Sequence, residues 1–262
     1  MDLDLTDRHA LVCGASQGIG RACAIELALL GASVTVLARH ADALRQLVHD
    51  LPRANAAQQH DFLVGDAADT DGLRRAAHGL VAERPVHILV NNTGGPPPGP
   101  VHGAQIEAFV AAYRMHLIAN HVLAEEVIPG MQAAGYGRIV NIISTSVKEP
   151  IAGLGVSNTT RWAVASWAKT LATELAPFGI TVNNVLPGST NTQRIEHIVA
   201  TRAEKSGVSI AEAQQAMEAE VPARRFAEPA ETAAAVAFLA SPAAAYINGI
   251  NLPVDGGRTR SL

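Results

Sequence analysis

Residues 14–20 read Gly-Ala-Ser-Gln-Gly-Ile-Gly, and this stretch decides the fold. It follows the apolar run Ala10–Cys13 and opens an Ala-rich run of helical character that extends to Leu30. Glycines at this spacing permit a tight turn and let backbone amides approach a pyrophosphate at a helix N-terminus. A glycine triplet alone is a weak signal, but its place between a strand and a helix predicts a dinucleotide site. The predicted contacts are Gly14, Ser16, Gln17, Gly18, Ile19 and Gly20.

Short apolar runs alternate with longer Ala-rich runs along almost the whole chain. We expect strands at Ala10–Cys13, Ser33–Ala38, Phe62–Val64, Val86–Asn91, Arg138–Ile143, Thr181–Leu186 and Ile250–Val254. We expect helices near Gly18–Leu30, Ala41–Leu51, Asp71–Ala82, Ala104–Ala133, Thr159–Ala176 and Glu228–Leu239. Apolar strands separated by helices indicate a parallel sheet that is covered on both faces. The pattern predicts a single doubly wound, Rossmann-type α/β domain over residues 1–262, with seven parallel strands and helices on both faces.

Two stretches break this alternation. Residues 94–103 read GGPPPGPVHG, and their Pro and Gly content excludes regular structure. Residues 193–225 are polar, charged and weakly periodic, and we expect them to form a lid over a substrate. Both stretches follow strands directly, at the sheet edge where ligands of open α/β sheets bind.

Composition excludes several classes of function. The chain has 262 residues, 48% of them hydrophobic and 17% charged, with a net charge of −4 and no Lys/Arg run, which argues against nucleic acid as a partner. Cys13 and Cys23 lack metal-ligand spacing and indicate a reducing compartment, and we expect no metal site. No apolar run reaches the roughly 18 residues of a membrane span. The acidic first residues lack the layout of a signal peptide. We therefore expect a cytoplasmic protein with no membrane partner.

The end of the second expected strand bears on the choice of cofactor. Residues 36–40 read Val-Leu-Ala-Arg-His and contain no acidic residue. An acidic residue there would bond the ribose 2′-hydroxyl of NAD, whereas an arginine accommodates the 2′-phosphate of NADP. Arg39 therefore favours NADP(H) over NAD(H), the alternative being that Arg39 is simply a solvated charge.

With Asn-Asn-Thr-Gly at residues 91–94 after the fourth strand, the chain resembles the short-chain dehydrogenase/reductase family, in particular its 3-oxoacyl-carrier-protein reductases. The resemblance covers essentially the whole chain and includes the glycine spacing of residues 14–20. It extends to Asn248-Gly249 and residues 255–257 near the end. It implies an adenine contact at Asp66 and Ala67, a ribose-side turn at Asn92 and Gly94, and a nicotinamide clamp at Pro187, Gly188 and Thr192.

The catalytic positions implied by the resemblance depart from the family pattern. Members usually carry Asn, Ser, Tyr and Lys. Aligning residues 140–144 (Val-Asn-Ile-Ile-Ser) places the family's serine at Ser144. Ser157 then stands at the tyrosine position, Arg161 at the lysine position and His116 at the asparagine position, and Thr93 replaces the usual alanine. The predicted tetrad is therefore degenerate, and only Ser144 is kept.

These substitutions alter the expected chemistry. In the family the tyrosine hydroxyl exchanges a proton with the substrate oxygen, and the lysine lowers the pKa of that hydroxyl. A serine hydroxyl without an adjacent base cannot do this. Arg161 stays protonated, so it can hold ribose oxygens and stabilise an oxyanion but cannot relay a proton. Loss of a placed general acid costs about 10²–10⁴ in rate.

Arg161 belongs to one stripe of helical spacing that begins just before the expected helix Thr159–Ala176 and continues along it. The stripe consists of Ser157, Arg161, Val164, Ala168, Leu171 and Leu175. A buried arginine needs partners, which are either a ligand (the cofactor ribose or an anionic substrate) or an internal salt bridge.

Three groups are candidates to replace the missing acid. His116 titrates near neutral pH, although a hydrogen-bonded core histidine explains it as well. Lys148 follows Ser144 by four residues, and a water held by Ser144 and Ser157 is the third candidate. Tyr113 lies one helical turn before His116 but fits an apolar stripe better. The residues alone do not choose among these groups.

The sequence therefore predicts an NAD(P)-dependent oxidoreductase that acts on a small carbonyl or alcohol substrate with an atypical proton donor. Two alternatives remain open: a catalytically silent NADP(H)-binding or sensing protein, and a non-redox lyase or isomerase. The helix Ala104–Ala133 is apolar on two faces, and the helix with Trp162 and Trp167 is also rich in apolar residues. Because family members are often homotetramers, we expect a homo-oligomer, most simply a tetramer.

Overall fold

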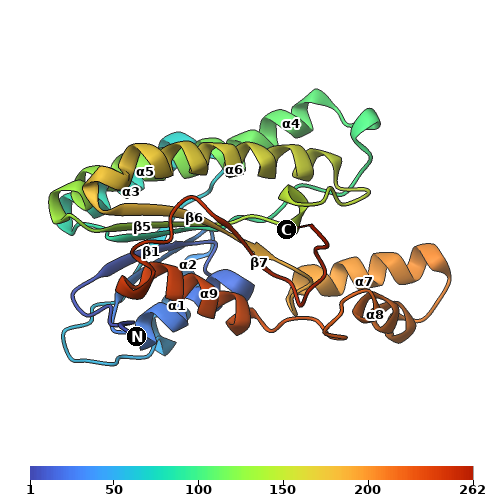
Figure 1. Cartoon of the computed structure of the whole chain (residues 1–262), viewed down its shortest axis with the longest axis horizontal. Helices are drawn as coiled ribbons and strands as arrows, with labels where there is room; N and C mark the ends of the chain where they lie inside the picture. The colour runs from blue at the N-terminus through green and yellow to red at the C-terminus, as the bar shows by residue number, and fades with distance from the viewer. Residues whose placement is uncertain (262) are drawn as a thin grey trace.

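The computed structural model describes residues 1–261, and a seven-stranded parallel sheet forms the centre of the molecule (Figure 1). The strands are β1 (His9–Cys13), β2 (Ser33–Ala38), β3 (Asp61–Val64), β4 (Ile88–Asn91), β5 (Gly137–Ile142), β6 (Ile180–Pro187) and β7 (Asn251–Val254). Their order is β3-β2-β1-β4-β5-β6-β7, so the order reverses between β1 and β4. Ligands of such sheets bind outside the carboxyl ends of the strands at this reversal. The predicted fold class is confirmed.

Helices cover both faces of the sheet. One layer holds α1 (Gly18–Leu29), α2 (Ala41–Asp50) and α9 (Pro229–Ala240). The other layer holds α3 (Thr70–Glu83), α4 (Ile106–Tyr113), α5 (Ala119–Ala134) and α6 (Gly155–Leu175), as Figure 1 shows. Alternation along β1 explains the two layers, because Ala10 and Val12 join the first core cluster while Leu11 and Cys13 join the second.

The long helix expected over Ala104–Ala133 is not regular throughout. A π-helical segment at Arg114–Ile118 separates α4 from α5, and the α4 helix begins only at Ile106. His116 lies inside this segment and is only 1% exposed. Segments of this kind occur frequently at functional sites. The helix α6 also differs from expectation, since it begins at Gly155 and thus includes Ser157.

Residues 193–225, expected as a weakly periodic stretch, contain two helices, α7 (Gln193–Ser206) and α8 (Ile210–Ala219). Apolar side chains of the two helices form a small separate core together with Phe226, and the helical members are Ile195, Val199, Ala203, Ala213 and Met217. Figure 1 shows both helices beyond one end of the sheet. Residues 94–103 lack regular structure, as predicted, apart from a short 3-10 turn at Val101–Gly103 and one bridge between Gly99 and Leu154.

Four asparagines form a ladder of side-chain hydrogen bonds across β4, β5, β6 and β7. The amide nitrogen of Asn91 donates to Oδ1 of Asn141 at 2.8 Å, and the amide nitrogen of Asn141 donates to Oδ1 of Asn184 at 2.9 Å. Asn184 donates in turn to Oδ1 of Asn251 at 2.8 Å. The four residues are direct partners in the strand register. Buried amides need such partners, so the ladder fixes this register.

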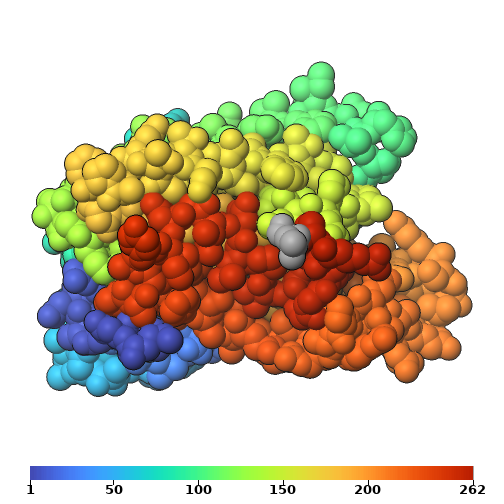
Figure 2. Space-filling model, viewed as in Figure 1, coloured from blue at the N-terminus to red at the C-terminus, as the bar shows by residue number. Residues whose placement is uncertain are grey.

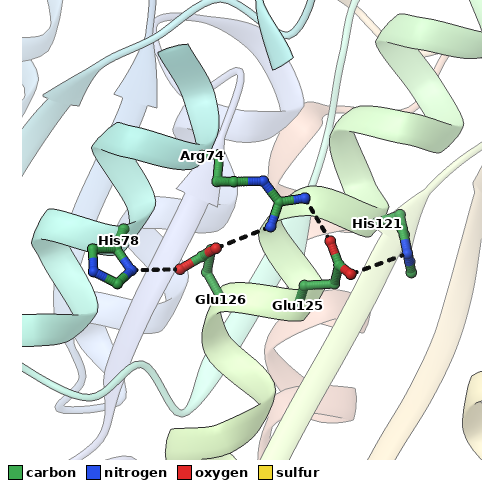
Figure 3. A network of polar contacts seen from close by, with 5 residues as sticks. All are labelled: Arg74, His78, His121, Glu125 and Glu126. Carbon is green, nitrogen blue, oxygen red and sulfur yellow. Dashed lines mark hydrogen bonds and ion pairs between the residues drawn. The ribbon is translucent and has the colours of Figure 1, made fainter. Parts of the chain in front are cut away.

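A second polar network joins α3 to α5 (Figure 3). Arg74 on α3 donates to Glu125 at 2.6 Å and to Glu126 at 3.1 Å, and the carboxylates also pair with His121 and His78. Most of these side chains are exposed, and such pairs contribute little individually to stability. The network therefore orients two helices rather than forming a site.

The C-terminal segment packs against the loop after β5. The carboxylate of Glu149 accepts the backbone amides of Arg260 at 2.6 Å and Ser261 at 2.7 Å. Figure 2 shows this dark red segment between the yellow-green residues near position 150 and the orange helices. Across residues 1–261, no helix is both long and apolar enough to cross a bilayer.

Candidate active site

A cleft of about 2570 Å³ lies at the carboxyl ends of the strands. The segments that follow all seven strands line it, together with the first two turns of α6 and one side of α7 along its length. Sixteen of the predicted site residues line this one cleft: Gly14, Ser16, Gln17, Gly18, Ile19, Arg39, Asp66, Ala67, Asn92, Gly94, Ser144, Ser157, Arg161, Pro187, Gly188 and Thr192. Two others, Gly20 and His116, are buried behind its wall.

The glycine loop after β1 is shaped for a phosphate group. Gly14 and Gly18 have φ of 58° and 55°, a left-handed conformation that other residues rarely adopt. A Cβ on Gly20 would collide with the carbonyl of Gly14. The α1 helix has no side-chain N-cap and no acidic residue in its first turn, so its first amides are left for a ligand. The loop therefore fits a dinucleotide diphosphate.

The loops after β2, β3 and β4 extend the cleft on either side. The side-chain amide of Asn92 donates to the carbonyl of Gly14 at 3.2 Å and so ties the β4 end to the glycine loop. Asp66 accepts the backbone amide of Ala68 at 3.0 Å. Arg39 is exposed at the end of β2 and has no ion pair within residues 1–261. A ligand in the cleft can therefore reach the guanidinium of Arg39.

Arg161 is buried at the base of the cleft and is only 7% exposed. Its Nη1 donates to the carbonyl of Ile142 at 3.1 Å and its Nη2 to the carbonyl of Thr93 at 3.4 Å, while Nε has no partner. Burial, followed by the charge of Arg194, lowers the pKa of Arg161 to about 10. The guanidinium is still charged at neutral pH. Within the described residues it makes no salt bridge, so an internal ion pair does not explain it.

Two serines, Ser144 and Ser157, line the same cleft as Arg161. Ser144 caps a short 3-10 turn, where its Oγ accepts the amide of Ser146 at 3.1 Å. The hydroxyl hydrogen of Ser144 is therefore available to donate. Ser157 lies in the first turn of α6, and its side chain is 7% exposed. Both are hydrogen-bonding groups, and neither lies beside a base in the part of the chain that the structure describes.

His116 is held from behind the cleft wall. Its Nδ1 lies 2.5 Å from the hydroxyl of Thr93, and its Nε2 is buried without a partner. The pKa of His116 is lowered to about 2, mainly by burial and further by the charges of Arg161 and Arg194. The imidazole is therefore neutral at physiological pH. This supports the interpretation of His116 as a hydrogen-bonded core histidine.

No tyrosine lines the cleft among residues 1–261. The hydroxyl of Tyr136 donates to the carbonyl of Ala240 at 2.6 Å, and Tyr246 is fully exposed. Tyr113 ends α4 and lies outside the residues that line the cleft. Lys148 is half-buried after the 3-10 turn and also lies outside them. Among the described residues, the structure thus places no phenol in the cleft.

One residue of the cleft escaped the sequence analysis. Arg194, the second residue of α7, places its guanidinium against Gly95. Desolvation lowers the pKa of this guanidinium, although the side chain as a whole is exposed. The only feature of the sequence that pointed to Arg194 was its position two residues after the predicted contact Thr192. That position is informative only once α7 is known to be a helix that begins there.

The fold and the cleft define a Rossmann-type dinucleotide-binding protein, and comparison with known proteins narrows this class. Residues 14–259 match a family model described as enoyl-(acyl carrier protein) reductase. The NADPH-dependent reductase BacG of Bacillus subtilis (strain 168) is 30% identical over 98% of this chain and 100% of its own length. The glucose 1-dehydrogenase of Gluconobacter oxydans (strain 621H) is 32% identical over 96% of this chain and 92% of its own length.

Solved structures agree. The crystal structure of L-sorbose reductase from Gluconobacter frateurii, complexed with NADPH and L-sorbose, superimposes with a TM-score of 0.93 at 29% identity and covers both chains completely. The chain belongs to the enoyl-(acyl carrier protein) reductase family of short-chain dehydrogenases/reductases and is an oxidoreductase. These comparisons do not favour the silent sensor or the non-redox lyase or isomerase considered above.

Proposed function

We propose that this oxidoreductase uses NADP(H) to interconvert a small carbonyl compound and its alcohol with a degenerate catalytic tetrad. One observation carries the proposal: the glycine loop and the polar group Ser144, Ser157 and Arg161 line the same cleft. In this proposal the glycine loop binds the dinucleotide, and the polar group binds the substrate oxygen that gains negative charge during reduction. His116 completes the tetrad positions only as a neutral partner of Thr93.

NADP(H) rather than NAD(H) is the proposed cofactor because Arg39 is exposed at the edge of the cleft with no acidic neighbour on β2. Asp66 and Ala67 would meet the adenine, Asn92 and Gly94 the ribose side, and Pro187, Gly188 and Thr192 the nicotinamide. The names of several relatives and neighbours, BacG and L-sorbose reductase among them, include NADPH.

A bound reduced nicotinamide would supply the hydride. The residues of the chain then deal with the charge on the substrate oxygen. The buried guanidinium of Arg161, fixed by the carbonyls of Ile142 and Thr93, stabilises that negative charge. The hydroxyl of Ser144 can donate to the same oxygen, because Oγ acts as the acceptor in its bond with the Ser146 amide and its hydrogen is not used there.

For the proton, we propose a water held between Ser144 and Ser157. Because the pKa of His116 is lowered to about 2, its protonated form is not populated at neutral pH and cannot donate the proton. Lys148 lies outside the cleft lining. Without a placed acid, turnover is expected to be slower by about 10²–10⁴ than with a tuned phenol.

We further propose that the chain is a single domain in which residues 193–225 act as a lid over the substrate. The α7 and α8 helices support this, since they rest on a small core of their own beside the cleft. A self-supporting unit of this kind can move without unfolding the sheet.

We also propose a cytoplasmic homo-oligomer, a tetramer by resemblance to the family. Large apolar side chains on α4 and α6 support self-association, because Ile106 is 76% exposed, Val110 55% and Trp162 51%. Light scattering of the protein eluting from a sizing column measures the mass directly. A monomer at micromolar concentration would contradict this part of the proposal.

The oxidoreductase proposal is tested by following reduced-nicotinamide absorbance with a panel of ketones, aldehydes and alcohols, using NADPH and NADH separately. We expect turnover of at least one carbonyl or alcohol, with higher kcat/KM for NADP(H). Tight NADPH binding with no turnover across the panel would instead favour a sensing protein.

A further inference from the structure

Two arginines approach the same loop of the cleft from different helices. Arg161 on α6 donates to the carbonyl of Thr93, and Arg194 on α7 lies against Gly95, two residues further along that loop. A Cβ on Gly95 would lie 2.6 Å from both terminal nitrogens of Arg194, so the missing side chain makes room for this guanidinium. Two positive charges therefore share one part of the cleft, and the charge of Arg194 lowers the pKa of Arg161.

No carboxylate neutralises the pair within residues 1–261. Four acidic residues line the cleft, and each is engaged elsewhere: Glu220 with Arg202, Glu228 with Asn191, Glu149 with the amides of Arg260 and Ser261, and Asp66 with the amide of Ala68. The protein itself therefore leaves both guanidinium charges without an acidic partner.

Both arginines stand where a cation is unfavourable on its own. Arg161 is more than nine-tenths buried, and its Nε has no hydrogen-bond partner. Arg194 lies in the first turn of α7, at the positive end of the helix dipole, which favours anions and disfavours cations. A buried charge such as that of Arg161 is costly unless a counterion accompanies it. An anionic ligand beside the two guanidinium groups would supply that counterion and would also be favoured by the N-terminus of α7.

We propose that Arg194, with the positive charge of Arg161 close by, binds a carboxylate of the substrate, which makes the substrate a small carbonyl compound that also carries an acidic group. This inference rests on the proposed function and specifies its substrate class. Planar guanidinium groups bind carboxylates through paired hydrogen bonds. The cofactor diphosphate is the other source of negative charge, but the amides of the glycine loop serve it, and the Arg194 guanidinium lies against Gly95.

Calorimetric titration of the protein saturated with NADP⁺ tests this inference independently of turnover. The probes are short-chain oxo acids, each compared with its methyl ester. The wild type is expected to bind the acids about tenfold to a hundredfold more tightly than the esters. Arg194→Gln should abolish this difference and leave the NADPH dissociation constant unchanged. The matched control is Arg202→Gln on the same helix, which removes an arginine already paired with Glu220 and should preserve the difference.

Gly95→Ala provides a second variant that keeps the charge. The added methyl group displaces the guanidinium of Arg194, so the preference for acids should again be lost. Wild-type protein that treats acids and esters alike would overturn the inference. So would an Arg194→Gln variant that binds NADPH weakly but acids normally, since the arginines would then serve the cofactor phosphates. Acids that bind but are not reduced would support the anion site and contradict only the proposed function.

Discussion

The hydroxyl of Thr93 lies 2.5 Å from Nδ1 of His116 and joins the loop after β4 to the π-helical segment between α4 and α5. This bond holds a buried imidazole. Its pKa is lowered to about 2, first by burial and then by the charges of two nearby guanidinium groups. His9 is a second buried histidine, and its pKa falls to about 4, mainly through burial. Its Nδ1 lies 3.0 Å from the carbonyl of Pro85, and Nε2 accepts from Arg84 at 3.0 Å.

The lowered pKa values of both histidines predict that the free energy of unfolding decreases in acid. In each case the folded pKa lies below the ordinary value of 6.5, so the unfolded chain binds more protons once the pH falls below 6.5. Their contribution is complete above 6.5 and declines by up to about 1.4 kcal/mol per pH unit for each residue. Denaturant unfolding at pH 7.5 and pH 5 should show His116→Asn to be less sensitive to pH than the wild type by about 2 kcal/mol. The exposed control, His102→Asn, should keep the wild-type dependence.

Gly18→Asp is expected to abolish dinucleotide binding, because it places a carboxylate beside the expected diphosphate and a side chain on a residue with φ of 55°. Calorimetry with NADPH measures the loss. Gly79→Asp is the matched control, since a Cβ on this α3 glycine meets nothing within 4 Å. Unchanged affinity in a folded Gly18→Asp protein would refute the cofactor site.

Arg39→Asp should shift the preference from NADP(H) towards NAD(H), because the carboxylate repels the 2′-phosphate of NADP(H) and can accept a hydrogen bond from the 2′-hydroxyl of NAD(H). The ratio of kcat/KM for the two cofactors is expected to fall by at least about tenfold, a typical effect of one charge-assisted hydrogen bond. The exposed Arg53→Asp serves as the charge-matched control. An unaltered ratio would show that Arg39 is not the selector.

Ser157→Tyr combined with Arg161→Lys is expected to raise kcat on simple ketones by up to about 10²–10⁴, because it would supply a phenol and an amine at the two positions of the proposed degenerate tetrad. Neither single substitution should suffice. Thermal unfolding should be followed in parallel, since Arg161 also holds the carbonyls of Ile142 and Thr93. A stable double variant with no gain would mean that the cleft is shaped for different chemistry.

Asn141→Leu should destabilise the protein by about 3 kcal/mol, because it removes two bonds of the asparagine ladder and leaves buried amide groups on Asn91 and Asn184 unpaired. Asn191→Ala removes an exposed bond to Glu228 and should cost much less. Equal unfolding free energies for the two variants would show that the ladder contributes nothing special.

The sequence predicted what depends on local pattern. Continuous apolar runs identified all seven strands within one or two residues, and the glycine loop lies along the cleft, as its place between a strand and a helix predicted. The start of α6 was missed because Leu154, its N-cap, makes no side-chain cap. The α7 and α8 helices looked irregular because they bury only a few side chains against each other. Arg194 was missed for the same reason, since its position against Gly95 follows only once α7 is known to be a helix.

The π-helical segment at Arg114–Ile118 acts as a phase shift along an otherwise continuous helix. Each residue of an α-helix turns about 100°, so the wider turn rotates α4 relative to α5 by a fraction of a revolution. Without it, the side chains of α4 would face other directions, and His116 would no longer meet Thr93. A deletion of one residue in this segment would thus rearrange one wall of the cleft while leaving every strand in place.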